Sequence, residues 1–260
     1  MRTEGAVEFA APAGEPLLLD LHLPDGPGPH PVTLWLHGGA WFLGSRTDDA
    51  ATTCRGLAER GIAVASADYR LGDAGAFPAS VEDVRAAVRW VRAEGERFGL
   101  ATGRVGCAGW SAGGHLSLMA ALTAADEGER VDAVADWFGP TDLLARLART
   151  EMERRFVRVP PDAQYLRTTV EDLDVDQARA ASPLHQRLAA APPTLIVHGD
   201  RDQQVSVEQS RRLHEALVAA GRESDLLVLG GAGHADPRYG APWVLDATAS
   251  FLRHHLGEPR

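Results

Sequence analysis

The chain has 260 residues, 45% of them hydrophobic, and a formal net charge of −10 at pH 7. A chain of this length can bury about three quarters of its unfolded surface. Nucleic acids and anionic membranes bind basic surfaces, so we expect neither as a partner of this acidic chain. All 26 basic residues are arginine, which excludes pyridoxal-phosphate, Schiff-base and P-loop chemistry because each needs a lysine.

Neither a membrane span nor a disulfide is expected. No apolar run approaches the ~20 residues that cross a bilayer. The first five residues lead into a polar segment without the apolar core of a signal peptide, so we expect a cytoplasmic protein. Cys107 lies on the expected strand before Gly109 and Cys54 in a helical pattern, and both are interpreted as small buried side chains.

The apolar pattern predicts a single α/β domain over residues 1–260. We expect helices between the strands from the fourth onward, hence a mainly parallel eight-stranded sheet with flanking helices, and an antiparallel edge formed by the first two strands. The strands are expected near residues 6–10, 17–23, 32–36, 62–68, 104–108, 132–138, 194–198 and 225–229.

Two helices have clear starting signals. Ser80 with Asp83, and Ser206 with Gln209, have the spacing of a capping box. The apolar residues that follow keep helical spacing and are expected to face the sheet: Val81, Val84, Val88, Val91, Leu213 and Leu217.

A glycine pair follows the third strand, in the run His37-Gly38-Gly39-Ala40-Trp41. Glycines there let backbone N–H groups point into a cleft, where they could complete an oxyanion hole with the N–H of Ala112. The alternative is an ordinary turn that uses glycine for positive φ. We expect His37 to organise the turn and Trp41 either to form a wall of the substrate pocket or to brace the loop.

Three polar residues, Asp68, Tyr69 and Arg70, close the fourth strand. An unpaired arginine would be costly at that place. We expect the three to form a buried network that holds the loop with the glycine pair, without a catalytic role.

The pentapeptide Gly109-Trp110-Ser111-Ala112-Gly113 lies between a strand and a helical pattern. Flanking glycines allow a sharp strand-to-helix turn that exposes the serine hydroxyl. Ser111 is therefore the candidate nucleophile, and Trp110 a candidate substrate contact. Taken alone, the pentapeptide is also compatible with an ordinary turn.

Residues 140–183 interrupt the alternation of strands and helices and are expected to form a small cap. Their apolar residues either line an acyl or aryl pocket or pack the cap onto the core: Leu143, Leu147, Met152, Phe156 and Val157. Their arginines either recognise a substrate carboxylate or form a solvated helix face: Arg149, Arg154, Arg155 and Arg158.

An acid and a base follow the last two strands. Asp202, favoured over Asp200, is placed to orient an imidazole, and either carboxylate could instead cap the helix near Ser206. His234, in the loop Gly230-Gly231-Ala232-Gly233-His234, is the candidate base. Three other histidines fit surface positions better: His214, His254 and His255.

The order Ser111, Asp202, His234 matches the α/β-hydrolase order of nucleophile, acid and base. The chain resembles carboxylesterases of that fold, in the group of hormone-sensitive-lipase-like and bacterial feruloyl/acetyl esterases, and is similar to arylformamidases. The resemblance rests on residues 37–41, 68–71, 77–78, 82–83, 109–115, 198–202 and 233–234. Ala40-Trp41, where lipase-like members usually carry a third glycine, favours the feruloyl/acetyl esterase and arylformamidase branches.

The resemblance implies hydrolysis of a small-molecule ester through an acyl-enzyme, with no metal and no cofactor. Carried over by position, it also implies that Gly39, Ala40 and Ala112 donate to the oxyanion. Amide hydrolysis, including that of arylformamides, and acyl transfer by the same triad are alternatives, and a binding protein that lacks turnover is a third. If the chain self-associates, a homodimer is the commonest arrangement.

Overall fold

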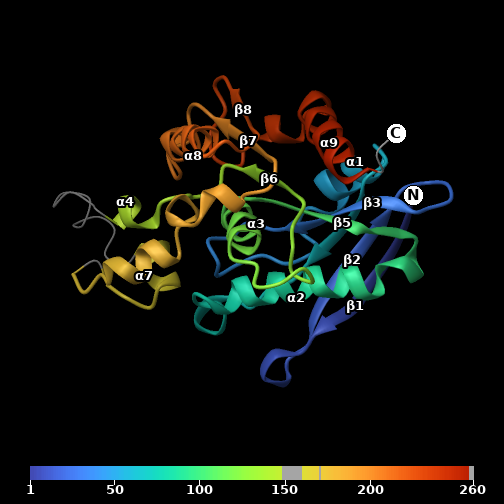
Figure 1. Cartoon of the computed structure of the whole chain (residues 1–260), viewed down its shortest axis with the longest axis horizontal. Helices are drawn as coiled ribbons and strands as arrows, with labels where there is room; N and C mark the ends of the chain where they lie inside the picture. Colours follow the sequence, from blue (N-terminus) through green and yellow to red (C-terminus); the bar gives the residue numbers. More distant parts are fainter. Residues whose placement is uncertain (148–159, 170, 258–260) are drawn as a thin grey trace.

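The computed structural model describes residues 1–147, 160–169 and 171–257 and contains an eight-stranded sheet (Figure 1). The strands are β1 (Arg2–Ala10), β2 (Leu17–Leu23), β3 (His30–Leu36), β4 (Ala63–Ala67), β5 (Leu100–Trp110), β6 (Ala133–Trp137), β7 (Thr194–Gly199) and β8 (Ser224–Leu229). Each overlaps one of the predicted strands, so the fold class expected from the sequence is confirmed.

The strands follow the order β1-β2-β4-β3-β5-β6-β7-β8. Strand β2 is antiparallel to both β1 and β4, whereas β4, β3, β5, β6, β7 and β8 run parallel, so the predicted antiparallel edge is confirmed. The carboxyl ends of the parallel strands therefore meet at one edge of the sheet, where open α/β folds bind their ligands.

Helices cover both faces of this sheet (Figure 1). One face carries α2 (Ala79–Glu94), α3 (Ala112–Leu122) and α8 (Val207–Ala219); the other carries α1 (Arg55–Ala58) and α9 (Pro242–Leu256). A π-helix, η2 (Ala50–Cys54), precedes α1. The described residues also form six short 3-10 helices: η1 (Pro12–Gly14), η3 (Gly72–Gly75), η4 (Gly95–Phe98), η5 (Pro183–His185), η6 (Leu188–Ala190) and η7 (Pro237–Gly240).

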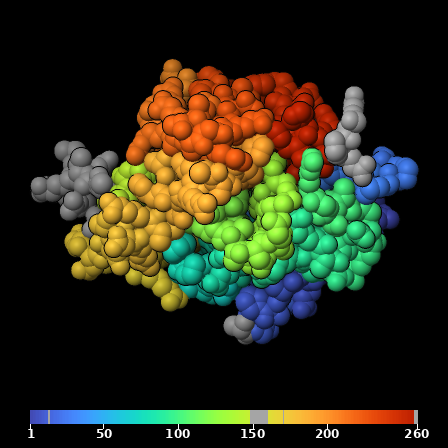
Figure 2. Space-filling view, in the orientation of Figure 1, coloured from blue at the N-terminus to red at the C-terminus, as the bar shows by residue number. Residues whose placement is uncertain are grey.

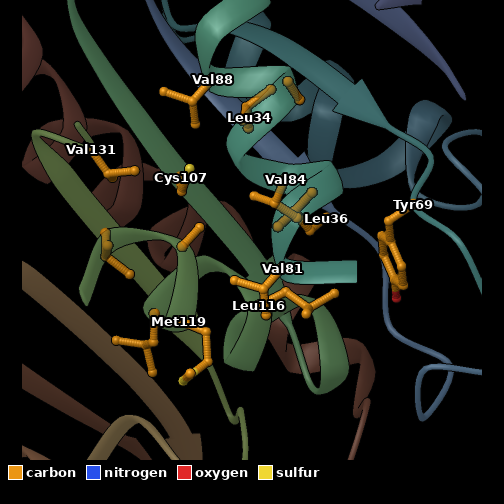
Figure 3. Close-up of a cluster of buried hydrophobic side chains, with 14 of the residues drawn as sticks. Leu34, Leu36, Tyr69, Val81, Val84, Val88, Cys107, Leu116, Met119 and Val131 are labelled. Atoms are coloured by element: carbon orange, nitrogen blue, oxygen red, sulfur yellow. The ribbon is translucent and has the colours of Figure 1, made fainter. Parts of the chain in front are cut away.

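Alternation along the strands divides the core between the two faces. Leu34 and Cys107 belong to the cluster beneath α2 and α3, whereas Trp35 and Ala108 belong to the cluster beneath α1 and α9. Figure 3 shows the first cluster, in which valines of α2 meet Leu116 and Met119 of α3. All six apolar residues predicted to face the sheet are buried, which confirms the helical periodicity: Val81, Val84, Val88, Val91, Leu213 and Leu217.

The capping box predicted at Ser80 is wrong. Helix α2 begins at Ala79, and no side chain of the described residues caps it. The Ser80 hydroxyl lies 3.1 Å from the Tyr165 hydroxyl, and the Asp83 carboxylate accepts hydrogen bonds from the Arg70 guanidinium at 2.7–3.0 Å. Both side chains bind residues far away in the sequence, which local spacing cannot reveal.

The second predicted capping box is half correct. The Ser206 hydroxyl caps α8 by accepting a hydrogen bond from the N–H of Glu208 at 3.3 Å. The side-chain Oε1 of Gln209 instead accepts hydrogen bonds from the N–H groups of Thr141 and Asp142, at 2.9 and 2.7 Å. Gln209 thereby fixes the chain where it leaves β6.

The described part of the segment predicted as a cap contains α4 (Leu143–Leu147), α6 (Pro161–Tyr165) and α7 (Val175–Ala180). In Figure 2 residues 160–185 lie at one end of the molecule, beside the segment that leads into α2. Leu143 and Leu147 are buried in the core, which favours packing over a pocket lining. The remaining apolar residues and arginines singled out in this segment lie outside the described residues: Met152, Phe156, Val157, Arg149, Arg154, Arg155 and Arg158.

Cys54 and Cys107 are both free and fully buried, as the sequence predicts, and burial raises the pKa of each thiol well above its usual range. Among the helices described, none is both long enough and apolar enough to traverse a bilayer.

Candidate active site

Ser111 occupies a sharp turn between β5 and α3. Its φ of 53° and ψ of −119° are strained for a residue with a side chain. The turn requires both flanking glycines, because a Cβ on Gly109 or Gly113 would lie 2.5 or 1.9 Å from the carbonyl oxygen of Leu36. The Ser111 N–H donates to the carbonyl of Trp137 at 2.8 Å, which ties the turn to β6.

The structure brings Ser111, His234 and Asp202 into one hydrogen-bonded series. His234 Nε2 lies 3.0 Å from the Ser111 hydroxyl oxygen, and His234 Nδ1 lies 2.7 Å from Asp202 Oδ2. A carboxylate only accepts, so Nδ1 carries the proton, and Nε2 is left to accept from the hydroxyl. The three residues come from the ends of β5, β7 and β8.

The Asp202 carboxylate is fully buried and held on both oxygens. Oδ1 accepts hydrogen bonds from the N–H groups of Gln204 and Val205, at 2.8 and 2.9 Å. Burial raises the pKa of Asp202, but the hydrogen bonds from His198, His234 and Val205 outweigh burial and hold the pKa well below its usual range. Asp202 therefore stays ionised next to His234.

The competing candidates lie elsewhere. Asp200 accepts a hydrogen bond from the N–H of Gly231 at 2.6 Å and is exposed. His214 contacts the Ser224 hydroxyl at 3.0 Å, and His255 lies 3.3 Å from Glu223. None of these contacts reaches Ser111 or Asp202.

His198 is a contact of Asp202 that the sequence analysis did not single out. It is fully buried at the end of β7, with Nε2 2.8 Å from the Val205 carbonyl and 3.4 Å from Asp202 Oδ2. Its Nδ1 lies 2.6 Å from the Ser210 hydroxyl. The sequence signal that could have indicated this contact is a histidine inside an otherwise apolar strand.

The loop after β3 presents backbone N–H groups close to the Ser111 turn. Gly39 has a φ of 115°, and a Cβ there would lie 2.0 Å from the Leu43 carbonyl oxygen. Its own carbonyl accepts from the N–H groups of Phe42 and Leu43, at 2.9 and 3.0 Å. Within the described residues, no hydrogen bond uses the N–H groups of Gly39, Ala40 or Ala112.

Tyr69 supports this loop from beneath. Its hydroxyl donates to the carbonyl of His37 at 2.9 Å, and the two rings stack with centroids 4.4 Å apart. Asp68 binds Arg46 at 2.8 Å, and Arg70 binds Asp83. Of the three residues predicted to form a network, Tyr69 thus contacts the loop at His37 and Asp68 contacts it further along at Arg46, whereas Arg70 binds Asp83 instead.

Trp41 is only 3% exposed, so its indole braces the loop in this structure, and contact with a substrate stays a prediction. The ring stacks on Tyr165 at 4.4 Å, and its N–H donates to His115 Nδ1 at 3.2 Å. His115 Nε2 donates in turn to the Ala181 carbonyl at 2.8 Å. Because burial lowers the pKa of His115 to about 4, the ring stays neutral and links the loop to the end of the cap segment.

A cavity of about 470 Å³, a volume typical of small-molecule sites, is lined by residues that flank Ser111 and His234 in the sequence. Its lining includes Trp110, which precedes Ser111, and Ala235, which follows His234. Phe138, also in the lining, places its ring centroid 4.9 Å from that of His234. Trp110 thus lines a cavity, and its contact with a substrate stays a prediction.

Asp136 lies buried beneath the first turn of α3, in contact with Gly114 and Gly139. A Cβ on either glycine would lie 2.1 or 2.5 Å from Asp136 Oδ1. Oδ1 accepts from the N–H of Gly139 at 2.9 Å, while Oδ2 has no partner among the described residues. Burial raises the pKa of Asp136 to about 7, against the opposing effects of Gly139 and His198.

This raised pKa predicts a specific pH dependence of stability. The unfolded Asp136 loses its proton near pH 3.8 and the folded one near 7, so its contribution to stability is complete below pH 3.8 and declines as the pH rises to 7. When the pH rises from 5 to 8, the free energy of unfolding of Asp136→Asn should therefore increase by about 3 kcal/mol relative to that of the native protein. Urea unfolding at both values measures this gain.

The control for this measurement is Asp176→Asn, because the side chain of Asp176 is 94% exposed. The free energy of unfolding of Asp176→Asn should change between pH 5 and pH 8 by the same amount as that of the native protein. An equal pH dependence in Asp136→Asn and the native protein would contradict the buried, protonated carboxyl.

No cluster of three or more His, Cys, Asp or Glu side chains in the part of the chain that the structure describes has the arrangement of a metal site.

The chain is similar to known esterases. A model of the BD-FAE family matches residues 19–217. Esterase LipC of Mycobacterium tuberculosis is 37% identical in an alignment that covers 79% of this chain and 53% of LipC. Carboxylic ester hydrolase LipN of the same organism is 34% identical in an alignment that covers 88% of this chain and 62% of LipN. The chain spans about half the length of several curated relatives that it matches.

Among solved structures, a truncated carbohydrate esterase from gut microbiota superimposes with a TM-score of 0.85 at 24% identity, covering 99% of this chain and 97% of that one. Such a superposition shows a shared fold. Together with the family match over most of the sequence, it shows that the chain belongs to the BD-FAE family and has the α/β-hydrolase fold.

Proposed function

We propose that the chain hydrolyses carboxylic esters of small molecules through an acyl-enzyme on Ser111. The observation that carries the proposal is the series Ser111–His234–Asp202, with separations of 3.0 and 2.7 Å between the hydrogen-bonded atoms. A serine hydroxyl is a weak nucleophile until a neighbouring base accepts its proton. The names of the relatives LipC and LipN, an esterase and a carboxylic ester hydrolase, agree with this chemistry.

In the first half of the reaction, His234 Nε2 takes the hydroxyl proton as the Ser111 oxygen attacks the ester carbonyl carbon. Asp202, ionised and fixed by two backbone N–H groups, holds the imidazole and stabilises the imidazolium that forms. His234 then gives the proton to the leaving alkoxide. In the second half, His234 activates a water that hydrolyses the acyl-enzyme, and Ser111 regains its proton.

The negative charge on the carbonyl oxygen in both halves is held by backbone N–H groups. We assign this role to Ala112, at the first position of α3, and to Gly39 and Ala40. A helix N-terminus adds a favourable dipole. Loss of one such donor typically costs about 3 kcal/mol of transition-state stabilisation. Since these donors are fixed by the fold, they need no reorganisation when the charge develops.

Hydrolysis of p-nitrophenyl esters from acetyl to decanoyl tests the proposal. We expect turnover, together with a single fluorophosphonate adduct that mass spectrometry locates on Ser111. Turnover that persists when fluorophosphonate occupies Ser111, or an adduct on another residue, would contradict the assignment. A folded chain that hydrolyses none of the esters would contradict ester hydrolysis.

Amide hydrolysis and acyl transfer share the same tetrahedral intermediate, so the triad alone does not separate them from ester hydrolysis. A comparison of each ester with its matched amide, and with an arylformamide, measures the preference. Product partitioning on addition of an alcohol acceptor measures transfer. We expect the ester and water to be preferred.

A further inference from the structure

The cavity lined by Trp110 and Ala235, whose lining residue Phe138 contacts His234, has one accessible aromatic wall and an acidic rim. Trp110 is partly exposed in it, whereas Trp137, Phe138 and Tyr239 form a floor in which each residue is less than 5% exposed. Asp49 and Asp236 also line the cavity, and among its described lining residues there is no arginine and no histidine. Its lining therefore carries only negative charge.

Asp49 is the carboxylate that determines the charge of this cavity. Its Oδ2 accepts hydrogen bonds from the indole N–H groups of Trp110 and Trp35, at 2.6 and 2.9 Å. Both donors are neutral, so they orient the carboxylate without compensating its charge. Oδ1 makes no hydrogen bond within the described residues, and η2, the π-helix that follows Asp49, is of a kind often found at functional sites.

Asp236 contributes less. Its Oδ1 accepts a hydrogen bond from the N–H of Arg238 at 2.9 Å, and the Arg238 guanidinium lies 3.8 Å from Oδ2. That guanidinium, 52% exposed, partly balances the charge of Asp236. The uncompensated negative charge of the cavity is therefore centred on Asp49, next to the Trp110 ring that Asp49 holds in place.

We infer that this cavity receives a positively charged, ammonium-bearing part of the ester substrate, an inference that rests on the proposed function. A cation gains both from the π-face of an indole and from a carboxylate beside it. A carboxylate-bearing substrate would meet Asp49 without a basic partner in the lining. Among otherwise matched esters, kcat/KM should therefore be highest for the cationic ester, lower for the neutral one and lowest for the anionic one.

Two matched series of esters test this ranking. In the first, phenyl acetates carry a para trimethylammoniomethyl, neopentyl or carboxymethyl group, so the ester bond is constant and a methylene insulates it from the charge. In the second, p-nitrophenyl esters carry acyl chains that end in trimethylammonium, tert-butyl or carboxylate. We expect kcat/KM for the cationic ester to exceed that of its neutral isostere by about tenfold in one series, and that series identifies which end of the substrate enters the cavity.

Asp49→Asn keeps an oxygen that can accept from the indoles and removes the charge. It should lower the cationic-to-neutral ratio of kcat/KM by about fivefold or more. Asp48→Asn is the matched control, since Asp48 carries the same charge one residue away and binds Ser45 outside the cavity lining. Its ratio should stay within about twofold of the native value.

The outcomes separate the two proposals. If neutral esters turn over without a charge ranking in either series, or if Asp49→Asn and Asp48→Asn change the ratio equally, the cation site is overturned and ester hydrolysis stands. If the folded native chain hydrolyses no member of either series, both proposals fail.

Discussion

Ser111→Ala is expected to lower kcat for p-nitrophenyl esters by about 10⁴- to 10⁶-fold while leaving the fold intact. The variant removes the atom that becomes acylated, and neither His234 nor Asp202 can replace it. Backbone N–H donors remain, so a small residual rate above that in water is expected. Steady-state kinetics at saturating ester and circular dichroism measure the two properties.

Ser117→Ala is the matched control. Ser117 lies on the same helix, and its hydroxyl donates only to the carbonyl of Gly113, at 2.9 Å. This variant should keep kcat within about threefold of the native value, because the lost hydrogen bond lowers only the free energy of unfolding, by about 1 kcal/mol. A Ser111→Ala protein with near-native kcat would exclude the acyl-enzyme on Ser111.

Gly113→Ala is expected to lower the free energy of unfolding by more than about 4 kcal/mol or to prevent folding. In a helix interior alanine is normally better than glycine by about 1 kcal/mol. Here the new Cβ would lie 1.9 Å from the Leu36 carbonyl oxygen and 2.6 Å from that of His37. Both are backbone atoms, so β3 and α3 would have to separate, and urea unfolding measures the loss.

Gly103→Ala provides the comparison for this substitution. Gly103 is an exposed residue of β5, and a Cβ added to it would meet no atom within 4 Å. Its free energy of unfolding should change by no more than about 0.5 kcal/mol. Equal stability of the Gly113 and Gly103 variants would contradict the close packing of the Ser111 turn against β3.

The strands and the candidate site residues could be anticipated from the sequence because their signals are local. The apolar runs before His37, Gly109, His198 and Gly230 are each bounded by glycine or polar residues, and parallel strands bring their carboxyl ends together. The proximity of Ser111, Asp202 and His234 then follows from topology. Their catalytic roles remain a proposal that the substitutions above test.

The features that the sequence did not predict depend on contacts between residues distant in the chain. Asp83 looks like a cap by its spacing, yet Arg70 binds it from another element. The link from His115 to Trp41 joins residues 74 positions apart, and that to Ala181 spans 66. The cavity beside Trp110 draws its lining from several loops. Periodicity and motif spacing carry no information about such pairs.

Two hydrogen bonds join the ends of the segment between β6 and β7, and they bear on how readily the length of that segment can change. The N–H of Leu143 donates to the Ser182 hydroxyl at 2.9 Å, and the N–H of Leu184 donates to the Thr141 carbonyl at 2.9 Å. The two ends therefore meet side by side at the sheet, and the chain between them is a closed excursion. Doubling the length of such an excursion costs only about 0.6 kcal/mol in closure entropy. Changes in the length of this excursion should therefore cost little, provided that Tyr165, which stacks on Trp41, is kept.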